Sequence, residues 1–260
     1  MSGFLARRFG KRVLDPVLRN VAVHARYRGV PRPAGRRAGD IRIVTRPDLG
    51  WFWFIPLSEE VTSVGLVISK EVHDRRQKVE PEAALDRYVS ETEVARSLLA
   101  GATRTSPVRV DSDFSYLASE HAGDRWLLAG DAGAFLDPIF STGVLMAMES
   151  GVEAAAAVHR GLTAGDLSRA AFRDYGRRVR RRYDHFRRFA LGFYEPAFRD
   201  LFFTEGRRWG LRGALLSVLA GDWRPSLAIR IRLAVFLALV YLQRRLPVAP
   251  RLQPRGLAGR

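Results

Sequence analysis

Over the first half of the chain, hydrophobic residues alternate with polar ones or form short apolar runs between turn signals, as is typical of β-strands. The strands that this pattern predicts span residues 21–28, 41–46, 51–57, 61–69, 104–110 and 114–118. Ser58, Glu59 and Glu60 form a short hairpin turn between the third and the fourth. Two short helices are predicted at residues 81–88 and 93–100. Residues from about 20 to 120 are therefore expected to form a mostly antiparallel sheet with helices.

The pattern changes after residue 125. An apolar strand at residues 126–130 leads into a turn, and from Ser141 onward the apolar positions follow a helical period. The predicted fold class is α/β, close to α+β, with a mostly antiparallel sheet, one strand–turn–helix unit and a helical C-terminal region. The predicted regions are residues 1–124, 125–160 and 161–260.

The turn after the strand at 126–130 carries candidate chemistry. Gly130 has no Cβ, so the backbone there can approach a ligand closely. Asp131 places a carboxylate at the strand end, where it can accept a hydrogen bond from a sugar or ribitol hydroxyl. A helix beginning at Ser141, Thr142 and Gly143 leaves unsatisfied N–H groups at the positive end of its dipole. These groups suit an anion or the electron-rich edge of a heterocycle.

The helix that follows has one face of small residues, which permits close packing on a sheet or a cofactor: Gly143, Ala147, Gly151 and Ala154. Strand–Gly-Asp–turn–helix units occur in many α/β proteins, so Gly-Asp alone is weak evidence. The full combination, however, resembles the second FAD motif of flavin-dependent monooxygenases and halogenases. The resemblance implies FAD as the cofactor and these binding residues: Gly130, Asp131, Pro138, Ser141, Thr142, Gly143 and Val144. It also implies that halide rests on the backbone amides of Thr142 and Gly143.

A second motif lies at residues 50–57, which contain W-x-W-x-I-P. Alternation places Trp51, Trp53 and Ile55 on one face of a strand, and Pro56 removes a ladder donor and ends it. The alternative interpretation is a strand that is simply buried on both faces. The motif is similar to the hallmark of flavin-dependent halogenases of the tryptophan-halogenase-like group. That resemblance implies an active-site wall formed by Trp51, Trp53, Ile55 and Pro56.

The G-x-G-x-x-G motif that binds the FAD pyrophosphate in this family does not occur in the chain. The resemblance covers nearly all of this chain but only the carboxy-terminal portion of the family's chain. The lysine that the halogenases use in catalysis belongs to the unmatched portion, and Lys11, Lys70 and Lys78 do not match it. No catalytic residue is therefore assigned. The chain alone is expected to bind FAD weakly.

Two classes of function follow from these motifs. The first is an FAD-dependent oxidoreductase part, halogenase-like, in which reduced flavin, oxygen and halide act on a small-molecule or carrier-bound substrate. Hydroxylation and reduction are the alternatives within the superfamily, and a flavin reductase is a candidate partner. The second class is a non-catalytic remnant or interaction module that has kept the fold.

Composition argues against a metal site and against nucleic acid as a partner. The 260 residues include no cysteine and five scattered histidines, so no metal site is predicted. The formal net charge is +16, but nearly all basic residues are arginine and no nucleic-acid-binding motif organises them, so nucleic acid is not predicted as a partner. The arginines at 177–182 are interpreted first as a solvated helix face and second as a contact for an acidic carrier protein.

The uncharged stretch at residues 233–242 would span about 15 Å as a helix, roughly half of a bilayer core. No transmembrane segment is therefore predicted. A core or lid helix is the first interpretation of this stretch, and weak peripheral membrane contact is the second. Because the first ten residues lack an apolar core of the signal-peptide type, a cytoplasmic location is expected.

Overall fold

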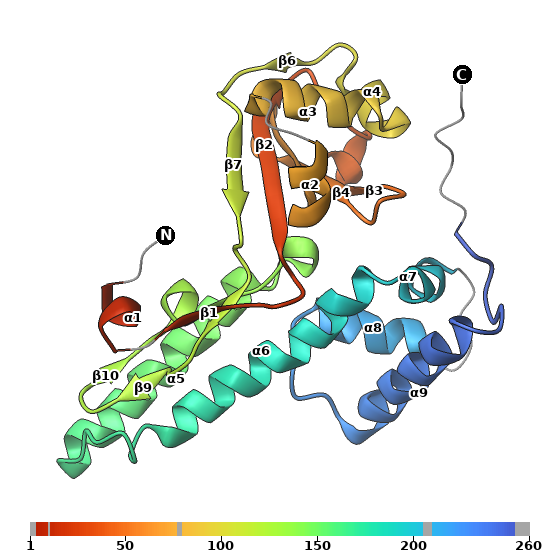
Figure 1. Ribbon diagram of the computed structural model, residues 1–260. Helices are drawn as coiled ribbons and strands as arrows, with labels where there is room; N and C mark the ends of the chain where they lie inside the picture. Colours follow the sequence, from red (N-terminus) through yellow and green to blue (C-terminus); the bar gives the residue numbers. More distant parts are fainter. Residues whose placement is uncertain (1–3, 10, 77–79, 205–209, 253–260) are drawn as a thin grey trace. The chain divides into compact units, whose positions relative to one another are not determined.

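The computed structural model describes residues 4–9, 11–76, 80–204 and 210–252, and these form two compact units. The sheet unit comprises residues 19–114, and the helical unit comprises the residues up to Leu18 together with residues 115–252. Each unit is described by itself below, with the labels of Figure 1. The boundary expected between residues 124 and 125 falls inside the helical unit. Residues 205–209 and 253–260 of the predicted C-terminal region lie outside the described residues.

The sheet unit is built on one six-stranded sheet, and its strand pairs among the described residues are antiparallel, as predicted. The order is β3-β4-β5-β2-β6, and β7 also pairs with β2. The strands are β2 (Asn20–Arg28), β3 (Arg42–Thr45), β4 (Trp51–Pro56), β5 (Val61–Ser69), β6 (Thr103–Arg104) and β7 (Arg109–Ser112). The predicted hairpin turn is confirmed by the bond from Leu57 N–H to Val61 O, 2.8 Å long.

One predicted strand is wrong in its extent. Residues 104–110 do not form a single strand, because β6 ends at Arg104 and β7 begins at Arg109. Pro107 between them has no N–H to donate to a ladder. The Ser106 hydroxyl instead accepts a hydrogen bond from Arg26 N–H at 2.9 Å, in place of a backbone partner.

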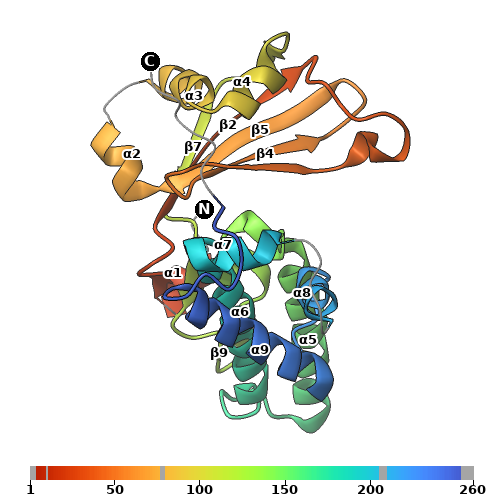
Figure 2. The ribbon, with the colours of Figure 1, turned by 90° about the vertical axis from the view of Figure 1, so that its right-hand side faces the viewer.

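Helices α3 (Pro81–Ser90) and α4 (Glu93–Leu99) cover one face of this sheet (Figure 2). Phe52 and Phe54 point to that face, are fully buried and share a hydrophobic cluster with Leu85 and Tyr88 of α3. A further helix, α2 (Lys70–Arg76), follows β5 directly and was not predicted. Its sequence has a single apolar side chain, Val72, and thus no helical stripe to recognise.

The helical unit contains two small antiparallel sheets, β1-β8-β11 and β10-β9, and a set of packed helices (Figure 1). Its short strands are β1 (Arg12–Leu14), β8 (Tyr116–Ala118), β9 (Ala122–Gly123), β10 (Trp126–Leu127) and β11 (Ala134–Phe135). Its α-helices are α1 (Phe4–Phe9), α5 (Gly143–Ala164), α6 (Arg173–Phe193), α7 (Pro196–Phe203), α8 (Leu211–Leu219) and α9 (Leu227–Gln243). The predicted strand at 126–130 is shorter than expected, since its ladder with β9 ends at Leu127.

An apolar stripe runs along helix α6 from its N-cap residue, and its five residues are buried: Phe172, Tyr175, Val179, Phe186 and Phe189. The interpretation of the arginine run as a solvated face is wrong for Arg182, which is only 1% exposed. Its Nε lies 2.5 Å from Glu149 and its Nη2 lies 2.9 Å from Glu153, both on α5. The guanidinium therefore joins α6 to α5. The neighbouring Arg181 is exposed, as predicted.

Helix α9 contains the uncharged stretch and buries Leu233, Phe236 and Val240. It packs against α7 through the edge-to-face pair of Phe236 and Phe198, whose ring centroids are 5.1 Å apart. Among the described residues, no helix is both long enough and apolar enough to cross a membrane. The packing agrees with the interpretation of this stretch as a core helix.

Candidate functional site

The turn after β10 is held tightly against helix α5. Gly130 has a φ of +55°, which favours glycine, and its N–H donates to the Ser150 hydroxyl at 2.9 Å. The same hydroxyl donates to the carbonyl of Ala147 at 3.0 Å. A Cβ on Gly130 would lie 3.2 Å from the Ala147 methyl group, so small side chains are needed on both sides. The turn and the helix thus form one local structure.

Asp131 follows within the 3-10 turn η2 (Gly130–Ala132), with its side chain exposed to solvent. Its backbone carbonyl accepts a hydrogen bond from the Tyr116 hydroxyl. Burial raises the pKa of Tyr116, with the Asp131 charge adding to the effect and Arg12 opposing it, so the phenol stays neutral and donates. Among the described residues, no donor reaches the Asp131 carboxylate. It is therefore free to accept from a ligand hydroxyl.

The proline bend is fixed by a buried acid. Asp137 is 1% exposed; its Oδ1 accepts from Ile139 N–H at 3.1 Å and its Oδ2 accepts from the Tyr194 hydroxyl at 2.8 Å. Pro138 is the first residue of the 3-10 turn η3 (Pro138–Phe140), where its missing N–H is not needed. Ser141 then adopts a left-handed conformation, with a φ of +53°. This conformation turns the chain into α5.

The start of α5 has unsatisfied donors. Thr142 is the N-cap residue and is 3% exposed, but its side chain makes no capping hydrogen bond. Its carbonyl accepts from Met146 N–H at 2.9 Å. Among the described residues, nothing accepts from the N–H groups of Gly143 and Val144, and the Val144 side chain is 72% exposed. An anion or a carbonyl edge can therefore bind at this helix end.

The aromatic residues of the W-x-W-x-I-P motif lie in the sheet unit, on strand β4. The centroids of Trp51 and Trp53 are 6.0 Å apart, and Trp53 Nε1–H donates to the Ser63 hydroxyl at 3.1 Å. Trp53 also lies beside His24, with ring centroids 5.7 Å apart. Because strand side chains alternate and the phenylalanines face the α3 side, the indoles face the opposite side of the sheet. Ile55 and Pro56 are half-buried.

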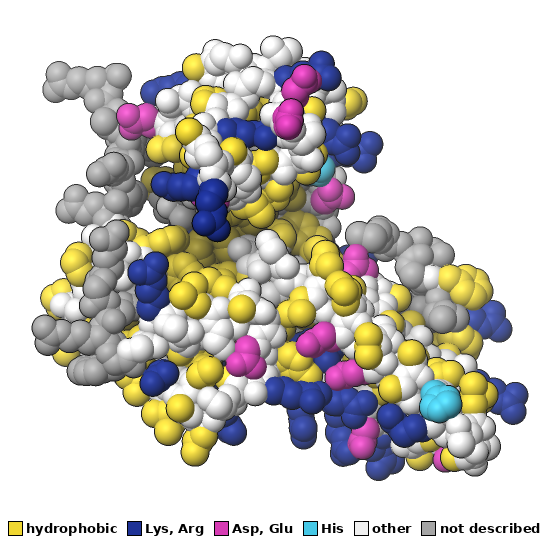
Figure 3. Space-filling view, turned by 180° about the vertical axis from the view of Figure 1, so that it is seen from behind, with side chains coloured by type: hydrophobic (Ala, Val, Ile, Leu, Met, Phe, Trp, Pro, Cys, Tyr) yellow, Lys and Arg dark blue, Asp and Glu magenta, His cyan; other side chains and the backbone are white. Residues whose placement is uncertain are grey.

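The surface of α5 has an exposed apolar face. Its exposed hydrophobic residues recur at helical spacing: Val144 at 72%, Met148 at 68%, Val152 at 72%, Val158 at 38% and Leu162 at 64%. Figure 3 shows hydrophobic side chains gathered at the surface of the helical unit seen from behind. Isolated exposed apolar side chains are common, but a continuous row along one helix indicates a surface that another element covers. We call this row the α5 apolar face.

The predicted site residues thus fall into two sets. The helical unit holds Gly130, Asp131, Pro138, Ser141, Thr142, Gly143 and Val144, and the sheet unit holds Trp51, Trp53, Ile55 and Pro56. The predicted small face of α5 is only partly used: Ala147 faces the turn, whereas a Cβ on Gly151 would meet nothing within 4 Å. Among the described histidines and acids, no group of three could hold a metal ion.

Sequence reasoning missed a cavity of about 660 Å³ beside the N-terminal half of α6. Its walls come from residues 119–122, which lead into the β9–β10 hairpin, and from residues 169–180. No spacing in the sequence connects these two segments, which lie some fifty residues apart. The density of arginine in α6 is the signal that the sequence offers for this cavity, and such a density is equally typical of a solvated helix face.

The turn and helix start fit one side of a flavin. Gly130 permits close approach of the backbone, the Asp131 carboxylate is free for a ribityl hydroxyl, and the amides of Gly143 and Val144 are free for the N1–C2=O edge. The described residues contain no glycine-rich helix start of the kind that holds a pyrophosphate. The fit therefore extends to the flavin ring and ribityl chain alone.

Comparison with known proteins agrees with this fit. The family model for tryptophan halogenase matches residues 13–207. A tryptophan 2-halogenase from Chondromyces crocatus is 33% identical over 203 residues, which are 75% of this chain and 38% of that protein. The 1H-pyrrole-2-carbonyl-[peptidyl-carrier protein] chlorinase of Pseudomonas fluorescens is 30% identical over 223 residues, 84% of this chain and 49% of that protein. The chain thus spans half or less of the length of these relatives.

A solved structure is similar as well. The myxobacterial chondrochloren halogenase, a variant of the FAD-dependent halogenases, has a TM-score of 0.67 and 30% identity, over 90% of this chain and 59% of that one. FAD is the cofactor that these matches imply. Since the family model covers most of the chain, the assignment does not depend on the motifs alone. The chain belongs to the tryptophan halogenase family.

Proposed function

We propose that this chain is the carboxy-terminal part of a flavin-dependent halogenase and works together with a nucleotide-binding half. The observation that supports the proposal most directly is the start of α5, where free N–H groups lie at the end of a turn held against the helix by Gly130 and Ser150. The same chain carries the paired indoles of Trp51 and Trp53. The nucleotide-binding half is the family segment that carries the G-x-G-x-x-G glycines.

In this proposal each set of residues has a distinct task. The amides of Thr142, Gly143 and Val144 hold halide or the flavin edge, since the helix dipole favours negative charge there. Asp131 accepts a hydrogen bond from the ribityl chain. Bound reduced flavin would supply the oxygen chemistry that oxidises halide. Trp51 and Trp53, with Ile55 and Pro56 beside them, form a wall that keeps the organic substrate away from the flavin.

The α5 apolar face supports the need for a second half. Val144, Met148 and Val152 are each more than two-thirds exposed, although they lie on the helix that carries the site. Burial of such side chains contributes about 1.5–3 kcal/mol each. The ladder of β10 also ends after Leu127, where the sequence predicts that the strand continues to residue 130. A nucleotide-binding half packed here would cover the helix face and extend the strand pairing.

The substrate proposed is a small or carrier-bound electron-rich aromatic. The name of the chlorinase relative gives its substrate as a pyrrole carried on a peptidyl-carrier protein, and this favours a carrier-bound substrate. A flavin reductase is the proposed source of reduced flavin, and the cytoplasm remains the expected location. Hydroxylation, reduction of carbon–carbon bonds and a non-catalytic role are the alternatives that the test below separates.

The test uses an assembled protein, which consists of this chain joined to a nucleotide-binding half of the family. Reduced flavin, oxygen and bromide are supplied together with an electron-rich aromatic, and products are followed by mass spectrometry. A brominated product that requires bromide is expected. Hydroxylated product in equal yield with and without bromide would reassign the protein as a monooxygenase. Absence of any oxygenated or halogenated product from a flavin-loaded assembled protein would favour the reductase or non-catalytic alternatives.

A further inference from the structure

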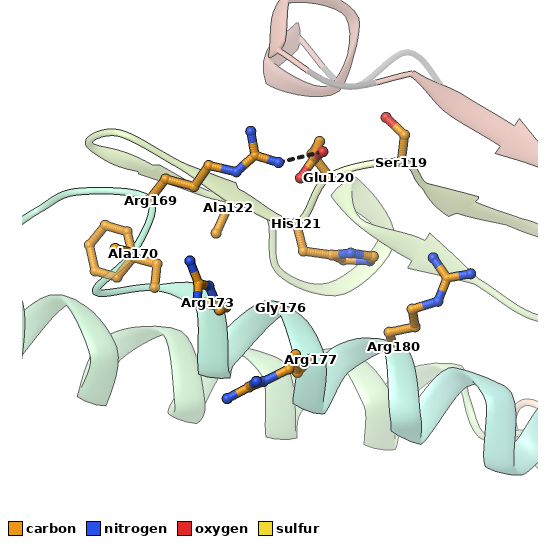
Figure 4. A pocket seen from close by; sticks show the side chains of 11 residues that line it. Ser119, Glu120, His121, Ala122, Arg169, Ala170, Arg173, Gly176, Arg177 and Arg180 are labelled. Atoms are coloured by element: carbon orange, nitrogen blue, oxygen red, sulfur yellow. Dashed lines mark hydrogen bonds and ion pairs between the residues drawn. The ribbon is translucent and has the colours of Figure 1, made fainter.

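The cavity of about 660 Å³ beside α6 is lined by residues of the segments 119–122 and 169–180, all in the helical unit (Figure 4). Its size is within the range of small-molecule sites in proteins. Ala122, Ala170 and Phe172 supply apolar wall, and arginine side chains supply most of the charge. The cavity can thus hold an organic body with an anionic group at one end.

The arginines differ in whether they are already paired. Arg169 donates to Glu120 Oε1 at 2.6 Å, and Arg177 pairs with an acid on its own helix. Arg173 has no carboxylate within ion-pair distance among the described residues. Arg180 has only a loose one, since Asp184 is 3.9 Å away. Figure 4 shows Arg173 and Arg180 rising from α6 toward the hairpin.

The helix keeps the space between these two arginines open. Arg173 and Arg180 are two helical turns apart on α6, and Gly176 lies between them on the same face. A Cβ on Gly176 would reach 3.7 Å from the Cβ of His121, so any longer side chain would fill the floor of the cavity. Glycine inside a helix costs about 1 kcal/mol relative to alanine. Its position here is explained by the open floor.

His121 supplies a second, independent observation. It lines the cavity from the hairpin, is 6% exposed, and its Nε2 has no hydrogen-bond partner among the described residues. Burial and then the charge of Arg180 lower its pKa to about 4, while a hydrogen bond with the backbone of Gly133 and the charge of Glu120 oppose this. The buried Nε2 of His121 and the exposed guanidinium groups of Arg173 and Arg180 line the same cavity, so an anion there can accept from all three.

We propose that this cavity binds a phosphate ester, with the phosphate held by Arg173 and Arg180 beside His121 and the organic part against Phe172. The arginine fork matches phosphate geometry, and two arginines match the double charge of a phosphate monoester. The apolar wall accounts for a volume larger than inorganic phosphate needs. The proposal does not rest on the proposed function, because neither the α5 start nor the aromatic wall contributes to the cavity.

The test is calorimetric titration of the whole chain at low salt with inorganic phosphate, pantetheine 4′-phosphate and adenosine 5′-monophosphate. Saturable binding of phosphate is expected, together with tighter binding of one or both esters. The preferred ester identifies the source of the phosphate, a carrier-protein arm or a nucleotide. Dephosphorylated pantetheine is expected not to bind. Failure of all three phosphates to bind saturably would overturn the proposal.

Variants separate the cavity from general charge attraction. Arg173→Gln and Arg180→Gln are each expected to weaken phosphate binding about tenfold or more, from loss of a charge-assisted hydrogen bond. Arg181→Gln removes the same charge from an exposed position outside the cavity and is expected to have little effect. Equal weakening by Arg181→Gln and Arg173→Gln would contradict a built site.

Two further readouts do not depend on removing an arginine. Gly176→Leu is expected to abolish ester binding while keeping the helix, since leucine is a better helix former than glycine. The imidazole of His121, followed by NMR, is expected to titrate at higher pH when phosphate is bound, because the anion offsets the charge of Arg180. Undiminished ester binding by Gly176→Leu, or a His121 titration that ignores bound phosphate, would overturn the proposal.

Discussion

Gly65 on β5 lies under the indole of Trp53, and replacing it with alanine tests how that side of the sheet is packed. A Cβ at this position would be 2.2 Å from Trp53 Cζ2, 2.5 Å from Trp53 Cη2 and 2.5 Å from the Cβ of His24. No real contact is that short, so the indole must move by more than an ångström. The Cβ of His24 is tied to the backbone of β2 and cannot move aside alone.

The magnitude follows from these contacts. Overpacking a closed site costs about 1–3 kcal/mol, and displacing the indole also disturbs the 3.1 Å bond from Trp53 to Ser63, which is worth about 1 kcal/mol. Gly65→Ala is therefore expected to lower the free energy of unfolding of the sheet unit by about 2–4 kcal/mol. Urea unfolding of the whole chain, followed by tryptophan fluorescence, measures this change.

A matched control is a glycine whose replacement by alanine is expected to stabilise the protein. Gly213 lies in helix α8, and a Cβ there would meet nothing within 4 Å. Gly213→Ala is expected to stabilise the protein by about 0.5–1 kcal/mol, because alanine loses less backbone entropy in a helix. If Gly65→Ala proved neutral or stabilising while Gly213→Ala behaved as expected, the packing of Trp53 over Gly65 would be refuted.

Three further predictions concern other parts of the chain. The pKa of His121 is about 4 in the folded protein, below its unfolded value of 6.5. Between these pH values the unfolded state therefore binds more protons than the folded state. The free energy of unfolding falls as the pH drops through that window, by on the order of 3 kcal/mol. His121→Asn should show a smaller loss between pH 7 and pH 4 in urea unfolding at each pH, and an unchanged slope would be contrary to this reasoning. Arg46 is 6% exposed, and its guanidinium group donates to Asp48, Glu91 and Thr92. Arg46→Lys should lower the free energy of unfolding by about 2–4 kcal/mol, because one ammonium group cannot reproduce the forked set of guanidinium donors. Full retention of the melting temperature in Arg46→Lys would show that the network contributes little. In the assembled protein, Asp131→Ala should weaken FAD binding by about 1.5–3 kcal/mol. It should not lower the melting temperature, since the Asp131 carboxylate has no partner among the described residues. An unchanged affinity for FAD would show that Asp131 does not belong to the site.

The local pattern predicted the sheet unit well, for identifiable reasons. The hairpin of β4 and β5 combines period-two alternation with a polar turn and a terminating proline, Pro56, and all three act locally. Pro107 also indicates the break within residues 104–110, but the apolar alternation on either side of it favours a single strand. Helix α2 could not be predicted, since a helix with only Val72 as an apolar anchor depends on its packing against the sheet.

Contacts between segments far apart in the sequence could not be predicted from local patterns. The sequence places Arg182 in a charged run, and only the approach of α5 shows that Glu149 and Glu153 bury it. The same holds for the cavity, whose two walls are brought together by the packing of α6 on the hairpin. The residues proposed to bind flavin follow from a motif, and the structure adds what the motif cannot: the free N–H groups at the helix start and the exposed face beside them.

We propose that Gly130, Asp131 and the start of α5 form one side of a flavin site that a nucleotide-binding half completes. The most direct measurement is titration of FAD into the chain alone and into the assembled protein, followed by flavin fluorescence at equilibrium. We expect sub-micromolar binding of FAD by the assembled protein and far weaker binding by the chain alone. Sub-micromolar binding by the chain alone would contradict the need for the second half, and no binding by a folded assembled protein would contradict the flavin site itself.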